Sequence, residues 1–360
     1  MILNSSFLSV ALALALQGAN ALSVSVVHPS ATPDGSGQGN NNSTCSNPSI
    51  RREWRTLSRD EKKNFIDGVR CLSQLPASPD LQPTGDNPDN QPRNTSSTLY
   101  DDFVYIHMDG LQSLHVTGRF FPWHRLFLHA FESHLKNQCG FTGALPYWDF
   151  TQDSANILAS TAFDADPEAG LGAWPDASTN FTVTTGGFRD LPYLDPGVSF
   201  PFEYSDPELE ANSTQTPENW QNIVGGSRGN FTAFQLSVDG HRLQGMHPST
   251  HVSAGGPEGD VTNLATSPSD PIFWLLHAQL DRLWWQWQTY HPDNFEAISG
   301  GETQDLVHVD DFPTGTGTPV TANTTLFMSN LFEDKKIGDV FDIMGGYLCY
   351  DYVQPNATQV

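Results

Sequence analysis

The chain has 360 residues and a formal net charge of −24, because 41 acidic residues stand against 17 basic ones. This excess of acid disfavours binding to nucleic acids and to like-charged membrane surfaces, since no basic surplus is available to displace counterions. Aromatic residues make up 11% of the sequence, so the chain can bury the core of one large domain or two small ones.

The first 21 residues carry no charged side chain and are expected to be a signal peptide. They contain the short apolar run FLSVALALALQ and the small residues Ala19 and Ala21, which favour cleavage before Leu22. The run is too short to span a bilayer, and no later segment has transmembrane character. Residues 22–44 are rich in Ser, Gly, Asn, Thr and Pro and are expected to form a flexible leader.

Two further features favour an exported glycoprotein. The cysteines are even in number and include no C-x-x-C pair, which favours disulfides over a metal site; they are Cys45, Cys71, Cys139 and Cys349. Glycosylation sequons occur at Asn41, Asn42, Asn94, Asn180, Asn212, Asn230, Asn323 and Asn356. The sequence therefore predicts a secreted protein that carries N-linked glycans.

Three helices are predicted in the first half. Ser58 and Glu61 form a capping box before an apolar pattern that runs to Leu72. A proline-rich loop over residues 76–93 separates this helix from a second one at 98–109. A third covers 121–137, with Pro122 in its first turn.

In the second half of the chain, the helical pattern of apolar residues is weak at first. Residues 150–235 are expected to form long loops with little regular structure, because Gly, Pro, Asp and Thr interrupt every apolar run. A second helical, histidine-bearing region begins at Leu243. Within it, a long helix is predicted to start at Asp270 and Pro271 and to reach Gln288. Residues 300–352 alternate turns with short apolar runs.

Histidines in these helices predict a metal site. His247 and His251 are four residues apart, on one helical face, and His277 lies on the helix that follows. The Glu that follows the first His in the zinc-protease motif H-E-x-x-H is missing here. The pair therefore lacks the general base that a zinc protease needs. His124, His129 and His134 are five apart, so each step turns about 140° and the three cannot share one metal.

A bend at 109–122 can instead bring His107, His115 and His124 to one point. Each half of the chain then supplies three imidazoles and no thiolate, a donor set that suits copper, zinc, iron or nickel. Three ligands leave coordination positions open, which is typical of a reactive site.

Three segments, FPWHRLFLHAFE, PYWDF and DPIFWLLHAQLDRLW, resemble the two copper-binding regions of the tyrosinase, catechol oxidase and haemocyanin family. The resemblance covers residues 98–150 and 243–290. It implies a mainly α fold whose central four-helix bundle holds a dicopper site, with long loops and few short strands. It also implies two copper ions with O₂ as co-substrate, and the copper ligands His107, His115, His124, His247, His251 and His277.

The same resemblance assigns supporting roles. We expect charged side chains to hold the ligand helices through charge-assisted hydrogen bonds, with Asp281 bracing the face of His277 or a neighbouring segment; they are Arg125, Glu132, Asp149, Asp281 and Arg282. The remaining histidines are expected at the surface or in packing: His28, His129, His134, His241, His291 and His308. Ser113 replaces a cysteine of many fungal members, so no thioether bridge to His115 is expected.

The substrate pocket is expected to include Pro248, Leu264 and Leu276. In members that hydroxylate monophenols, an Asn stands where this chain has Pro248, which lacks an acceptor. We therefore favour a catechol oxidase, which converts o-diphenols to o-quinones, over a tyrosinase. Other readings are an o-aminophenol oxidase, a haemocyanin-like oxygen carrier with a blocked pocket and a metal-free glycoprotein binding module; catalytic turnover and copper content separate these.

Four cysteines allow three disulfide connectivities. We pair Cys71 with Cys139, at the ends of two helices expected to pack together, which leaves Cys45 for Cys349. The catalytic domain is expected over 45–352 and a tail over 353–360, without the C-terminal shielding domain of many relatives.

Overall fold

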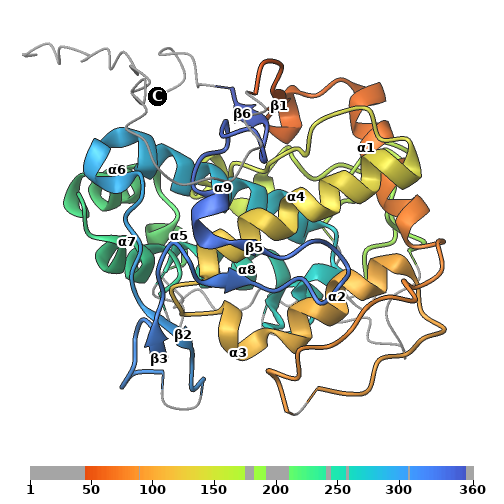
Figure 1. Cartoon of the computed structure of the whole chain (residues 1–360). Coiled ribbons are helices and arrows are strands. Elements are labelled where there is room, and N and C mark those ends of the chain that lie inside the picture. Colours follow the sequence, from red (N-terminus) through yellow and green to blue (C-terminus); the bar gives the residue numbers. More distant parts are fainter. Residues whose placement is uncertain are drawn as a thin grey trace, which may run out of the picture. The chain divides into compact units, whose positions relative to one another are not determined.

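The computed structural model describes residues 45–88, 90–174, 182–191, 211–240, 245–256, 259–306 and 309–353. The predicted signal peptide, the leader and the tail beyond Val353 lie outside the described residues. Figure 1 shows how the helices and strands are arranged. Across the described ranges, no helix has both the length and the apolar character needed to cross a membrane.

Four helices form the centre of the fold: α2 (Leu99–Asp109), α4 (Phe120–Cys139), α8 (Met246–Gly255) and α9 (Ile272–Tyr290). The long helices α4 and α9 pack against each other and run through the middle of Figure 1. On the outer side of α4 lies α1 (Arg59–Leu72). The expected mainly helical fold, with a central four-helix bundle and few short strands, is confirmed.

Local sequence signals explain where these helices begin and end. Ser58 and Glu61 form the predicted capping box of α1, and Thr98 and Asp101 form a second one for α2. In α4, Pro122 lies in the first turn, where its missing amide hydrogen costs nothing. Gly140 ends α4 with a left-handed φ of 66°, a conformation in which a side chain would be strained.

The expectation of loops throughout 150–235 is wrong for its last part. Within the described residues of that range lie α5 (Ala211–Thr214) and α6 (Pro217–Gly226), and α7 (Phe231–Val238) begins there. Thr216 caps α6 and Asn230 caps α7, while Phe231 and Phe234 are buried. Their polar capping residues and glycines are typical of turns, which is why the sequence did not predict these short helices. They are stabilised by the burial of a few large side chains rather than by a local helical pattern. Residues 150–174 and 182–191 contain only short 3₁₀ turns.

The strands are short and join distant parts of the chain. β1 (Ser49–Arg51) pairs in parallel with β6 (Tyr350–Tyr352). Hairpins join β2 (Gly301–Thr303) to β3 (Thr316–Pro319) and β4 (Thr325–Leu326) to β5 (Lys335–Lys336). The disulfide Cys45–Cys349 lies beside the β1–β6 pair, and Cys71–Cys139 joins the ends of α1 and α4. This is the connectivity expected from the sequence, with Cα separations of 5.3 and 5.7 Å.

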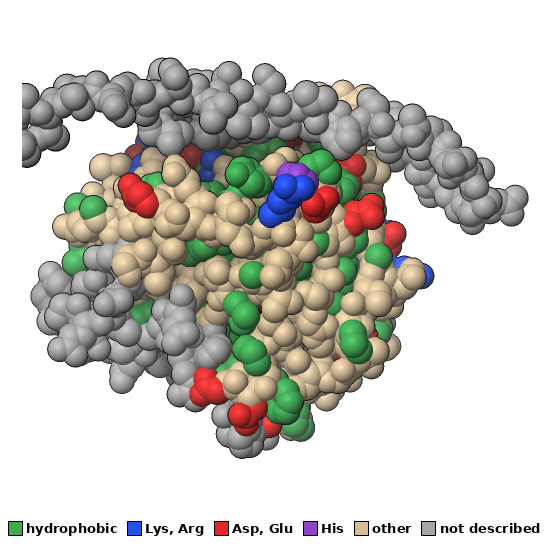
Figure 2. Space-filling view, turned by 90° about the vertical axis from the view of Figure 1, so that its left-hand side faces the viewer, with side chains coloured by type: hydrophobic (Ala, Val, Ile, Leu, Met, Phe, Trp, Pro, Cys, Tyr) green, Lys and Arg blue, Asp and Glu red, His purple; other side chains and the backbone are tan. Residues whose placement is uncertain are grey.

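Aromatic side chains fill the space between the central helices. Phe131 of α4 stacks on Trp274 of α9 with ring centroids 3.5 Å apart. Six aromatic residues in the segments that carry the ligand histidines are all buried in this core: Phe120, Phe121, Trp123, Phe273, Trp274 and Trp284. On the face shown in Figure 2, by contrast, hydrophobic side chains are scattered rather than gathered in one patch. The packed interior therefore fixes the relative positions of the helices that carry the histidines.

Candidate metal centre

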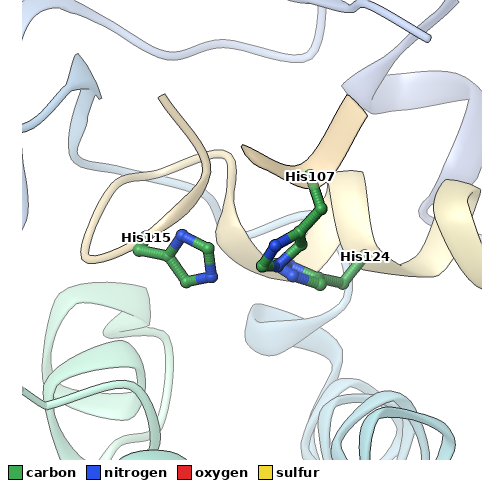
Figure 3. Close-up of side chains that lie close together, drawn as sticks. All are labelled: His107, His115 and His124. Carbon is green, nitrogen blue, oxygen red and sulfur yellow. The ribbon is translucent and has the colours of Figure 1, made fainter. Parts of the chain in front are cut away.

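The first histidine triad comes from three consecutive elements. His107 lies near the end of α2, His115 directly follows α3 (Leu111–Leu114), and His124 lies in the second turn of α4. Their possible ligand atoms lie within 4.8 Å of one another. In Figure 3 the ring of His115 points across a small gap toward the rings of His107 and His124. The bend expected between residues 109 and 122 thus brings the three imidazoles together.

The second triad comes from two helices. His247 and His251 lie one turn apart on α8, and His277 lies on α9. Their possible ligand atoms also lie within 4.8 Å of one another. The Nε2 atoms of His251 and His277 are 3.1 Å apart. Two neutral imidazole nitrogens at that separation suit two ligands of one metal ion, because metal–nitrogen bonds are about 2.0 Å long.

The two triads face each other. The rings of His124 and His277 stack with centroids 4.6 Å apart, and those of His115 and His247 are 6.3 Å apart and nearly parallel. All six side chains are buried. One buried centre therefore has two adjacent positions, each surrounded by three imidazoles.

Most of these histidines have an acceptor that fixes the ring. Five Nδ1 atoms face oxygen atoms: the carbonyls of Ala265, Leu111, Phe120 and Val261 for His107, His115, His124 and His251, and a carboxylate oxygen of Asp239 for His247. An Nδ1–H that donates to such an oxygen leaves the Nε2 lone pair for a metal. His277 is the exception, since its Nδ1 has no partner, and it stacks on Phe273 instead.

The protonation of the six rings also suits a metal. Burial lowers the pKa of every one of them, and the pKa of His115 and His251 falls to about 4. They are therefore neutral near pH 7, as metal ligands must be. The Nε2 atoms of His107 and His124 are buried without a hydrogen-bond partner. A metal ion at each triad would satisfy these atoms, so the residues fit the copper pair that the resemblance implies.

Charged side chains hold the ligand helices, as expected, although not through the histidines. Asp281 does not bond to His277; it accepts hydrogen bonds from Arg51 and Arg125. The Arg125–Asp281 ion pair joins α4 to α9, which fixes His124 relative to His277.

Three other predicted charges act in the same way. Glu132 pairs with Arg51 at 2.8 Å, which ties α4 to β1. Arg282 donates to Gln279 on α9 and lies 3.7 Å from Asp149, next to the segment PYWDF. These contacts hold the helices in place rather than tune individual imidazoles.

A cavity of about 470 Å³ opens beside the triads. It is bounded by His115, His247 and His251 and by side chains that include Val116, Asp239, Pro248, Val252, Leu264, Thr262, Ser267, Leu306 and Val309. Pro248 and Leu264 thus line the cavity. The expectation for Leu276 is wrong, because that side chain is fully buried in α9 and does not line the cavity. A helix position next to a ligand points away from the metal, since one residue turns the helix by about 100°.

The remaining histidines lie elsewhere. His129 packs on Phe332 and Tyr347, and His134 packs on Phe103. His291 lies at the end of α9, whereas His28, His241 and His308 lie outside the described residues.

Sequence reasoning gave no role to Asp239, which contacts His247. No spacing rule could have placed it, because it lies just past the last residue of α7, outside the helical period.

Comparisons with known proteins agree with this geometry. A family model described as the common central domain of tyrosinase matches residues 97–290. The tyrosinase ustQ of Aspergillus flavus is 32% identical over 369 residues, which cover 96% of this chain and 90% of that protein. N-acetyl-6-hydroxytryptophan oxidase ivoB of Emericella nidulans is 29% identical over 85% of this chain and 92% of that protein. A polyphenol oxidase from Thermothelomyces thermophila has a similar fold, with a TM-score of 0.65, 24% identity, and coverage of 85% and 89%.

Proposed function

The chain belongs to the tyrosinase family of type 3 copper oxidoreductases, and we propose that within this family it is a catechol oxidase. Its cofactor is a binuclear copper centre, for which two buried histidine triads are suited. We propose that the ligands are His107, His115, His124, His247, His251 and His277. The observation that carries the proposal is the cavity of about 470 Å³, which reaches both triads from outside.

The proposed reaction converts two o-diphenols and one O₂ into two o-quinones and two waters. Each diphenol loses two electrons and two protons, and O₂ takes up four of each. The copper pair supplies the two-electron redox chemistry when it is bound. The chain supplies six neutral imidazoles in fixed positions and apolar side chains along the cavity, including Val252 and Leu264, against which the substrate ring can pack.

The side chain after His247 supports the preference for diphenols. A phenol must lose its proton to bind a metal well, and its pKa is about 10. Pro248 lines the cavity there and has no acceptor for that proton. The carboxylate of Asp239 is already engaged by His247 and Val116. Catechols are more acidic than simple phenols and chelate readily, so they need less assistance.

Pro248→Asn should raise phenol hydroxylation relative to catechol oxidation. An amide oxygen at this position can hold a water that accepts the phenol proton, and a tenfold rise in the rate ratio corresponds to about 1.4 kcal/mol of barrier. The measurement is the ratio of the rates with tyrosol and 4-methylcatechol, at two coppers per chain. Pro248→Ala is the matched control, since it removes the ring of proline without adding an acceptor and should leave the ratio unchanged.

Two outcomes would contradict this assignment. Equal rates on tyrosol and 4-methylcatechol in the unsubstituted enzyme would identify it as a tyrosinase. The same shift in Pro248→Ala as in Pro248→Asn would mean that backbone freedom near His247, rather than an acceptor, controls the ratio.

A second candidate function is the oxidation of a hydroxylated indole, which is favoured by the 29% identity to an N-acetyl-6-hydroxytryptophan oxidase. A substrate panel that contains 4-methylcatechol, tyrosol, 2-aminophenol and a 6-hydroxyindole separates these activities. An oxygen carrier of the haemocyanin type would turn over none of them.

We also propose that the chain is exported through residues 1–21 and glycosylated. Two disulfides support an oxidising compartment. The sequon asparagines Asn94, Asn230 and Asn323 are exposed. Asn230 uses its Oδ1 to cap α7, which leaves its Nδ2 for a glycan.

Digestion of the secreted chain with an N-glycosidase should lower its apparent mass. Combined substitution by Gln of Asn94, Asn230 and Asn323, the sequon asparagines that are exposed among the described residues, should reduce that shift. No shift on digestion of the unsubstituted chain would contradict glycosylation.

A further inference from the structure

Asp239 uses both oxygens of its carboxylate in the metal centre. This residue follows α7 and is buried, with 3% of its surface exposed. Its Oδ1 lies 2.9 Å from Nδ1 of His247, and its Oδ2 accepts a hydrogen bond of 2.8 Å from the backbone amide of Val116. Val116 directly follows His115, so one carboxylate contacts the immediate surroundings of both triads.

His247 differs from the other five histidines in its acceptor. The rings of His107, His115, His124 and His251 face neutral backbone carbonyls, whereas the ring of His247 faces a carboxylate. A carboxylate acceptor fixes the Nδ1–H tautomer and makes Nε2 a stronger base. His247 is therefore the imidazole whose affinity for a metal depends most on a single side chain.

The backbone at Val116 needs a restraint. Its φ of 52° lies in the left-handed region, which is strained for a β-branched residue. Such a conformation persists only where the surroundings over-determine it. Here Asp239 holds the amide, and Gln304 donates to the carbonyl of Val116 at 3.0 Å.

We propose that Asp239 is a positioning residue that sets the two triads relative to each other. It holds His247 in the tautomer that can bind copper, and it holds the strained backbone after His115. This inference rests on the ligand set proposed above but not on the choice between diphenol and monophenol substrates.

Asp239→Asn tests the role because it preserves size and removes one acceptor. If the amide oxygen accepts from His247, the NH₂ group meets the amide hydrogen of Val116. If the oxygen accepts from Val116, the NH₂ group donates to Nδ1 of His247 and moves the ring proton to Nε2, which can then no longer bind a metal. Either arrangement loses one of the two functions. Asp239→Glu retains two acceptors and should restore part of the affinity.

The experiment measures copper binding by the full chain, separately from activity. The protein is stripped of copper, reloaded, and titrated against a chelator of known affinity. We expect Asp239→Asn to bind one of its two coppers roughly 10–100-fold more weakly, as is typical for loss of an outer partner of a ligand. The matched control is Asp153→Asn, since Asp153 is also buried but bonds to Trp148 and Ser160. That control should retain both coppers with unchanged affinity.

Each outcome bears on the proposal. Two coppers bound with unchanged affinity in Asp239→Asn would overturn it. An unsubstituted protein that does not hold two coppers would instead overturn the ligand set. If Asp239→Asn does not fold, the double variant Asp239→Asn with Val116→Gly is used, because glycine adopts this φ without strain. Wild-type copper affinity in the double variant would also overturn the positioning role, and weakened binding of one copper would support it.

Discussion

His124→Ala is expected to lower oxidase activity by at least about a thousandfold, equivalent to about 4 kcal/mol of barrier. The substitution removes one of three imidazoles at the first position, and a two-electron reaction needs both metals. The helix should persist, since alanine has the highest helix propensity. The lost Nδ1 contact is local, to the carbonyl of Phe120 in the same helix. Activity on 4-methylcatechol and copper content are both measured, and fewer than two coppers per chain are expected.

His129→Ala provides the matched control. It lies on the same helix but packs on Phe332 and Tyr347, away from the triads. It should retain two coppers and activity close to that of the unsubstituted enzyme. Full activity of His124→Ala with two bound coppers would remove His124 from the ligand set.

The histidines could be predicted because helical geometry links spacing to direction. His247 and His251 share a face at a separation of four, and steps of five take His129 and His134 away from His124. These relations hold whatever surrounds the helix. A bend after Asp109 brings His107, His115 and His124 together. The glycine in that segment makes such a bend possible, but the sequence does not determine its geometry.

The contacts of Asp239 and Asp281 could not be predicted from the sequence. Asp281 lies four residues after His277, so a brace within the helix was a natural expectation. Its partners instead come from β1, α4 and β6, whose positions depend on the whole tertiary structure. Asp239 lies just past the end of α7, where helical periodicity no longer fixes the direction of a side chain. The helices α6 and α7 were missed for a related reason, because their stability comes from packing of a few side chains.

Asp281 is the centre of a buried polar network that joins both ends of the domain to the ligand helices. Its carboxylate accepts from Arg125 of α4, from Arg51 of β1, and from the hydroxyls of Tyr350 and Tyr352 of β6. Burial by itself raises the pKa of Asp281, but Arg125 and Arg51 outweigh it, and the pKa is lowered overall. Four donors therefore depend on one ionised side chain.

Asp281→Asn should destabilise the copper-free protein by about 3–5 kcal/mol, the usual cost of leaving buried charges without their partner. Arg51 and Arg125 are both fully buried, so water cannot replace the lost carboxylate. The free energy of unfolding is measured in urea at pH 7. The control is Asp293→Asn, which breaks an ion pair with Arg228 that is more than half exposed and should cost less than about 1 kcal/mol. A similar small cost at Asp281 would mean that the arginines find other partners.

The pH dependence gives an independent check on the same carboxylate. A carboxyl whose pKa is lower in the folded state contributes stability above its unfolded value of about 4, and this contribution disappears as pH falls through the folded pKa. Acidification below pH 4 should therefore remove stability from the unsubstituted protein through Asp281. Asp281→Asn cannot lose that contribution, so the difference in unfolding free energy between the two proteins should shrink as the pH falls from 5 toward the folded pKa. A difference that stays constant over this range would show that the pKa of Asp281 is the same in the folded and unfolded protein. The cost of the substitution would then have to come from hydrogen bonding to Tyr350 and Tyr352 rather than from charge.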